Sequence, residues 1–258
     1  VAPTGAPITD TEERGDELTP GTALRLNLMP GDVKIEGHDG PRVHVSTTRF
    51  VRVAKVASAR LALEGLAMRV DYGADYLGLT TAVQDDMEAL GCTEYRTDVT
   101  VRLPRGVPVL LRKKDGDTHI ANVFTDLTIE QEAGSVHIEN AQGNVKIVLN
   151  EGDIETQNTA GQLELGASNG DIDVFRPYGN LRVQCEGGNT VIDTPGAGVF
   201  ARTKGGDVRL IAVEGVKADY DIETENGNIS LAVPESADAT FWIEVIDDSD
   251  LPGHRASR

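Results

Sequence analysis

The feature that most constrains this chain is a repeat of eighteen residues in its second half. Each repeat begins with a glycine, at Gly116, Gly134, Gly152, Gly170, Gly188 and Gly206. The Gly206 repeat is three residues longer, and Gly227 then restarts the pattern. A fixed period of this kind is typical of solenoid proteins, in which each repeat packs only on its neighbours.

Each repeat contains two short segments in which apolar and polar residues alternate. Val136–Ile138 is an example from a first half, and Val145–Ile147 is one from a second half. Alternation is the period of a half-buried strand, and the Gly-Asp and Gly-Asn pairs between segments favour turns. Only 4% of the residues are aromatic, so the interior must be built from small aliphatic side chains. The sequence therefore predicts an all-β fold, a β-solenoid of 18-residue, two-strand coils with two sheets facing across a thin core.

Residues eighteen positions apart form columns in such a stack. The seventh position holds Asn122, Asn140 and Asn158. We predict a ladder of side-chain amides bonded along the axis, the alternative being three independent turn asparagines. The second position is mostly acidic, with Asp117, Asp153, Asp171 and Asp207. Carboxylates one strand apart repel, so they must be solvated, capped by backbone N–H groups or bridged by a cation, and we expect capping.

The rest of the chain divides by composition into further parts. Residues 1–20 are polar and without periodicity, which predicts an extended arm or linker. Residues 21–115 are β-rich but irregular, and we expect them to cap the open end of the solenoid, where strand edges would be unpaired. Regular coils are predicted for 116–245, and an acidic, polar tail for 246–258.

Local patterns place elements within the irregular region. Strands are expected where apolar residues alternate, at 23–28, 31–35, 42–45, 59–65, 67–73, 75–81 and 98–104. Residues 82–90 instead place three apolar residues on one helical face, with Thr81 as a candidate N-cap and Gly91 just beyond the end. These signals predict one short helix there.

Charge and hydropathy exclude several classes of partner. The formal net charge is −18, so phosphate backbones of nucleic acids and anionic lipid headgroups would be repelled. No apolar run approaches the ~20 residues that a membrane-spanning helix requires, so membrane insertion is not expected. No basic and apolar leader follows Val1, which is expected either if a signal peptide has been removed or if the sequence has been trimmed, and the two alternatives stay open.

The two cysteines, Cys92 and Cys185, form neither a disulfide framework nor a metal-binding motif. Cys185 is expected as a small buried core residue. Whether it pairs with Cys92 stays open, because the geometry of the pair decides it.

The order of several segments resembles the bacterial "putative adhesin" β-strand-repeat family of unknown function. The resemblance rests on GDVKIEGHDGPRVHV near the start, VRLPRGVPVLLRKKDGD before the repeats, the repeated GDI and GNV units, and the closing TENGNISLAVPESA. It covers about residues 21–245. It implies a single-domain β-solenoid, usually exported or envelope-associated, without enzyme activity.

Calcium binding, transition-metal binding and enzyme activity are three alternatives to a surface with a purely structural role. A calcium-binding β-roll needs G-G-x-G-x-D, and the nearest matches, Gly187–Asn189 and Gly205–Asp207, lack the following G-x-D. A shared transition metal is conceivable along a fourth-position column, His119, His137, Glu155 and Asp173, but a solvated strand face is the favoured interpretation.

An enzyme is the third alternative. β-Helical polysaccharide lyases and hydrolases use exterior carboxylates, but here the carboxylate spacing follows from the repeat alone. No nucleophile elbow, P-loop or dinucleotide motif is present. We therefore assign no catalytic residue, cofactor or metal ligand.

The sequence predicts a non-enzymatic, extracytoplasmic structural or adhesin-like protein, either secreted or cell-envelope associated. In one hypothesis it is a homo-oligomer or polymer, a self-assembling surface or fibre subunit, with strand edges of the last coil and the arm at 1–20 pairing with a neighbour. In the alternative it is a monomeric module that binds an envelope polysaccharide or protein. A β-helical carbohydrate-active enzyme is the weakest alternative.

Overall fold

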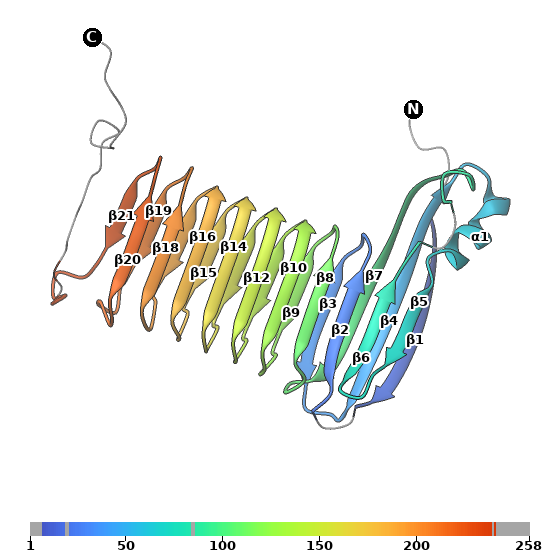
Figure 1. Ribbon diagram of the computed structural model, residues 1–258, viewed down its shortest axis with the longest axis horizontal. Coiled ribbons are helices and arrows are strands. Elements are labelled where there is room, and N and C mark those ends of the chain that lie inside the picture. The colour runs from blue at the N-terminus through green and yellow to red at the C-terminus, as the bar shows by residue number, and fades with distance from the viewer. Residues whose placement is uncertain (1–6, 19–20, 84–85, 239, 241–258) are drawn as a thin grey trace, which may run out of the picture.

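The computed structural model describes residues 7–18, 21–83, 86–238 and 240, and it is built from strands stacked along one axis (Figure 1). The strands form two facing sheets, of eleven and ten strands. Successive coils run from the blue and green end of the rod to the red end, with about seven turns in total. The predicted all-β solenoid is confirmed.

The first sheet, called sheet A, has eleven strands. In spatial order they are β1 (Ile8–Glu17), β4 (Arg42–Val53), β7 (Cys92–Pro104), β3 (Val33–His38), β9 (Thr118–Ala121), β11 (Val136–Glu139), β13 (Ile154–Gln157), β15 (Ile172–Phe175), β17 (Thr190–Asp193), β19 (Val208–Ile211) and β21 (Ile229–Ala232).

The second sheet, called sheet B, has ten strands. In spatial order they are β20 (Tyr220–Thr224), β18 (Val199–Thr203), β16 (Leu181–Gly187), β14 (Leu163–Asn169), β12 (Val145–Glu151), β10 (Leu127–Ala133), β8 (Val109–Lys113), β2 (Ala23–Leu28), β6 (Tyr76–Thr81) and β5 (Met68–Tyr72).

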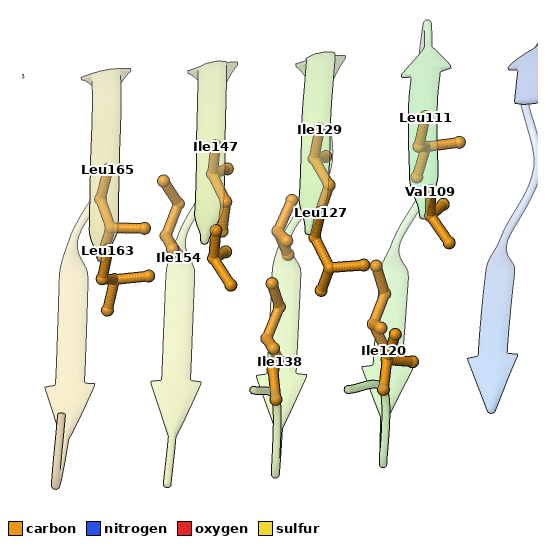
Figure 2. Close-up of a cluster of buried hydrophobic side chains, with 14 of the residues drawn as sticks. Val109, Leu111, Ile120, Leu127, Ile129, Ile138, Ile147, Ile154, Leu163 and Leu165 are labelled. Atoms are coloured by element: carbon orange, nitrogen blue, oxygen red, sulfur yellow. The ribbon is translucent and has the colours of Figure 1, made fainter. Parts of the chain in front are cut away.

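Parallel pairing between residues eighteen positions apart sets the register of the regular coils. Ile138 lies beside Ile120 in sheet A, and Ile147 lies beside Ile129 in sheet B. Figure 2 shows these aliphatic side chains pointing into the space between the two sheets. All four are fully buried, and most of the other side chains in the interior are also isoleucine, leucine or valine.

The glycine that opens each coil is required by the close stacking of backbones. Gly134 has a φ of +93°, in the left-handed region that favours glycine. A Cβ atom at this position would lie 2.2 Å from the carbonyl oxygen of Gly116 in the preceding coil. No side chain fits there, and this contact explains why glycine recurs at the start of each repeat.

The N-terminal end of the rod differs from the predicted arm. Residues 8–17 form β1, an edge strand paired antiparallel with β4 of the same chain. The segment lacks apolar periodicity because its charged side chains take the place of a core. Arg14 and Asp16 are in register with buried Val45 and Val43, and the Tyr72 hydroxyl donates to Asp16 at 2.7 Å. Charges on the inward face end the stack and protect its edge.

The short helix lies elsewhere than predicted. Residues 59–65, expected as a strand, contain α1 (Ala59–Glu64), which follows the 3-10 helix η1 (Val56–Ser58). Over so few residues the apolar positions satisfy both periods. Ala59 and Ala62 are buried three residues apart, and the good helix formers Ala, Leu, Arg and Glu decide the outcome.

The helix predicted over 82–90 is absent from its described positions, 82–83 and 86–90, of which 87–90 form a turn. Leu90 N–H donates to Asp86, and Cys92 N–H donates to Met87 at 2.8 Å, so the chain makes one turn before Gly91 takes a φ of +71°. Met87 is still buried against α1, as its apolar character predicts.

At the opposite end, β20 and β21 are the outermost described strands. Ile229 and Leu231 are 50% and 37% exposed, whereas their register partners Val208 and Leu210 are fully buried. Residues 241–245 and the predicted tail at 246–258 lie outside the described residues. Within the described ranges, no helix is long and apolar enough to cross a bilayer.

Candidate binding surface

The asparagine column lies at the turn that follows the sheet A strand of each coil. Asn122, Asn140 and Asn158 have φ angles of 58°, 53° and 52°. The Asn140 amide donates to the Asn122 side-chain oxygen at 3.4 Å, and that of Asn158 donates to Asn140 at 3.2 Å. Asparagine is one of the few residues that tolerate the left-handed region. The same turn therefore favours this residue type and brings the amides together.

The acidic column at the second position caps the backbone of the neighbouring coil. Asp117 accepts the backbone N–H of Ser135 at 2.9 Å, and Asp153 accepts that of Asp171 at 2.9 Å. Each carboxylate thus satisfies a donor one coil further along, as the capping interpretation predicts. The stacked charges are held apart from the core and contribute hydrogen bonds along the axis.

A network of buried polar side chains lies where the irregular region meets the regular coils. The Lys113 ammonium donates to the Asp117 carbonyl at 2.5 Å, and burial lowers its pKa to about 8 against the pull of nearby carboxylates such as Asp32. Gln131, one coil further along, donates to the Gly134 carbonyl at 2.7 Å. The sequence analysis missed this network, although a lysine at an inward strand position signals it.

Cys185 occupies the same column as Gln131 and is buried. Its thiol contacts the Gly170 carbonyl at 3.4 Å, and burial, together with the charge of Asp171, raises the pKa of the thiol. The predicted small core residue is confirmed. Cys92 and Cys185 are both free thiols, so the open question of their pairing is answered in the negative.

One row of side chains on the outer face of sheet A runs along the rod. We call it the axial row, and in spatial order its members are Ser46, Thr100, Lys34, His119, His137, Glu155 and Asp173. Neighbouring members are register partners on adjacent strands, which lie about 4.8 Å apart. The row places a hydrogen-bonding group on every strand from β4 to β15.

The two histidines of the axial row stack face to face. The ring centroids of His119 and His137 are 4.9 Å apart with an angle of 7° between the planes, and His137 Nδ1 lies 3.5 Å from a Glu155 oxygen. Burial, then the neighbouring His137 and Lys34, lower the pKa of His119. The first half of the row is therefore rich in hydrogen-bond donors.

The far half of the axial row carries carboxylates. Burial raises the pKa of Asp173, and the charges of Asp171 and Glu155 raise it further. The row thus changes from basic side chains to carboxylates between His137 and Glu155.

Stacked imidazoles are poorly arranged to share a metal, because the nitrogen lone pairs lie in parallel ring planes rather than converging. Over the part of the chain that the structure describes, no group of three or more His, Cys, Asp or Glu side chains is arranged to hold a metal ion. The His119–Asp173 column is thus a polar surface row.

Two shallow hollows on the outer face of sheet A adjoin the axial row and share Thr100. The larger, of about 650 Å³, is lined mainly by Glu13, Gly15, His44, Ser46, Thr100 and Arg102. The smaller, of about 230 Å³, is lined mainly by Asp32, Lys34, Asp98, Thr100, Asp117 and His119. We call these two neighbouring hollows together the polar depression.

The fold is shared with a solved structure. A "putative adhesin" from Bacteroides fragilis NCTC 9343 gives a TM-score of 0.55 at 16% identity, covering 89% of this chain and 98% of that chain. A "putative cell adhesion protein" from Clostridium sporogenes ATCC 15579 is 13% identical, with a TM-score of 0.34, 87% of this chain covered and 100% of that chain. No curated protein shows significant similarity to this sequence.

A family model describes most of the rod. Residues 92–247 match the Toastrack DUF4097 model, which covers β7 and all the regular coils. The resemblance expected from the sequence is confirmed by this match and by the shared fold. Since the match spans more than half of the chain, the protein belongs to the Toastrack DUF4097 family.

Proposed function

We propose that this protein is a non-enzymatic, extracytoplasmic, adhesin-like binding protein that holds an extended envelope polymer, a polysaccharide above all, along the axial row. The observation that carries the proposal is the row itself, which presents donors or acceptors at one strand spacing over seven strands. A linear polymer with polar groups along its length matches such a surface better than a compact small molecule does.

The names of the similar structures support the same class of function. Several are described as adhesins or a cell adhesion protein. The depression is open and shallow, as expected for a surface that binds a polymer anywhere along its length.

The test uses Thr100, because this residue lines both hollows. A Thr100→Trp variant fills the depression with a bulky side chain that a strand tolerates. The matched control is Thr128→Trp, which changes an outward threonine on β10 of sheet B. Wild-type protein and both variants are sedimented with insoluble cell-wall polysaccharide fractions.

We expect wild type and Thr128→Trp to pellet with at least one fraction and Thr100→Trp to stay in the supernatant. If wild type binds no polymer, or if Thr100→Trp binds as well as wild type, the proposal is wrong.

Self-assembly is the second candidate, and the exposure of Ile229 and Leu231 on the last described strand favours it. The charged strand β1 at the other end of sheet A opposes a head-to-tail contact, because Ile229 and Leu231 of β21 would meet charged side chains. Light scattering coupled to size exclusion, with negative-stain images, decides the matter. A regular polymer that an Ile229→Glu/Leu231→Glu variant dissolves supports assembly, and a 27 kDa monomer at all concentrations rejects it.

A further inference from the structure

The first half of the axial row concentrates basic side chains on an otherwise acidic protein. Lys34, His119 and His137 are register partners on the neighbouring strands β3, β9 and β11. The chain carries a net charge of −18, so three basic or titratable side chains in one row are unexpected. Lys34 is exposed and makes no ion pair or hydrogen bond with any residue that the structure describes.

Three of the acidic side chains around this group have partners of their own. Glu36 pairs with Arg102 at 3.5 Å. Asp32 and Asp117 each accept a backbone N–H from the next coil, and their charges act on the buried Lys113 ammonium beneath them. The ammonium of Lys34 is therefore left to face the solvent over the smaller hollow.

We infer that Lys34, His119 and His137 bind an anionic group, a carboxylate or phosphate carried by a polymer that lies along the axial row. The inference rests on the proposed function and names the chemical class of its ligand. An oxyanion above Lys34 and His119 would receive charge-assisted hydrogen bonds from both, with Thr100 as a neutral donor in the same hollow. His137 adds a further donor one strand away.

Binding of an anion at this place is coupled to uptake of a proton. The charged or titratable groups that act on His119 are Lys34 and Glu36 of β3, and His137 and Glu139 of β11, with Asp117 in the turn that precedes its own strand. Burial first, and then the neighbouring His137 and Lys34, lower the pKa of His119 and so favour its neutral imidazole. A bound oxyanion opposes that effect, so the complex is favoured at mildly acidic pH.

The experiment measures affinity for three soluble probes at about pH 5.5 and about pH 7.5, on either side of the ordinary titration range of histidine. Polygalacturonate presents carboxylates, inorganic polyphosphate presents phosphates, and dextran is an uncharged control. The variants are Lys34→Gln and His119→Gln/His137→Gln. Arg209→Gln is the matched control, because Arg209 is an exposed cation in the same register row on β19. Thermal unfolding verifies that each variant folds.

We expect at least one anionic probe to bind about tenfold more tightly at the lower pH, one decade for each pKa unit gained on binding. Both test variants should lose that gain, and Arg209→Gln should keep it. A pH titration followed by proton NMR should show that the pKa of His119 rises when the probe is added. The relative strength of the two anionic probes then separates a carboxylated ligand from a phosphorylated one.

Two other results overturn the inference. If dextran binds as well as the anions and Thr100→Trp abolishes that binding, the proposed function stands but the anionic ligand is wrong. If the anionic probes bind equally to wild type and to both test variants, contact is made elsewhere on the surface.

Discussion

The side-chain amide of Asn158 donates to the side-chain oxygen of Asn140 at 3.2 Å, and both residues have φ angles near +52°. These two asparagines thus fit the left-handed backbone of the turn and also form a side-chain hydrogen bond along the rod. A turn that forces the left-handed region selects asparagine or glycine, and only asparagine also carries a group that bonds along the rod. The two contributions can be separated by substitution.

The first prediction concerns Asn140, which donates to one neighbour and accepts from the other. Asn140→Gly loses both side-chain hydrogen bonds but keeps the backbone relaxed. We expect its free energy of unfolding to fall by about 1 kcal/mol. Asn140→Ala loses the bonds and adds the left-handed penalty, for a total of about 2–3 kcal/mol. Urea unfolding measures both values, and equal losses in the two variants would rule out the backbone contribution.

Arg176 occupies the next position of this column and has a φ of 52° without the advantages of asparagine. We expect Arg176→Asn to stabilise the protein by about 1 kcal/mol, because it relieves backbone strain and extends the ladder from Asn158. Arg176→Ala is the control, since it removes the same side chain and keeps the strain. Should both variants unfold at the same urea concentration, neither strain relief nor ladder extension is at work.

Gly134 is predicted to tolerate no side chain. A Cβ would meet the Gly116 carbonyl oxygen at 2.2 Å, so Gly134→Ala must push two coils apart. We expect a loss of about 2–4 kcal/mol in urea unfolding, the range of strained or overpacked positions. Gly106→Ala is the control, because no atom lies within 4 Å of a Cβ built there, and it should be close to neutral.

The buried Lys113 predicts an unusual pH dependence. Its pKa falls from an ordinary value of 10.5 to about 8 in the folded protein. Between these two values the unfolded chain binds the proton and the folded chain does not, so the free energy of unfolding rises with pH from about 8 to 10.5. Below pH 8 the buried charge of Lys113 destabilises the fold by a constant amount, so this group adds no pH dependence there.

Lys113→Gln should remove that rise and stabilise the protein at pH 7 by about 1–3 kcal/mol. Glutamine is the residue that the next coil uses in the same column, at Gln131, where it bonds to backbone carbonyls. Urea unfolding of wild type and variant at several values from pH 7 to pH 10.5 measures both effects. Parallel stability curves for the two proteins would contradict the prediction.

The regular coils were predictable because one short pattern is repeated many times. Each error in a single repeat is corrected by its neighbours, so the strand pairs and the two sheets follow from the period alone. The outward column from His119 to Asp173 follows from the same period, since residues eighteen apart must stack. The close packing of the two imidazole rings depends on rotamers, which the pattern does not determine.

The irregular region has no such redundancy, and some of the elements predicted there from the sequence were wrong. Residues 59–65 fit a strand and a helix equally well, and packing of Ala59 and Ala62 against β4 decided for the helix. β1 has no apolar face, since its inward residues Arg14 and Asp16 bond to Tyr72 instead of a core. The polar depression was also hidden, because it joins strands such as β4 and β3 that follow no common period.

The aspartate column gives several coils the same connection to the next, with a carboxylate of one coil bonded to a backbone N–H of the following one. A complete unit of eighteen residues that carries this aspartate, such as residues 152–169 with Asp153, therefore offers ends that match those of other such units. Duplicating or deleting one unit would change the length of the rod by one strand spacing, about 4.8 Å, and leave every remaining junction intact. Evolution or design can thus adjust the length of the rod in fixed increments by adding or removing repeats.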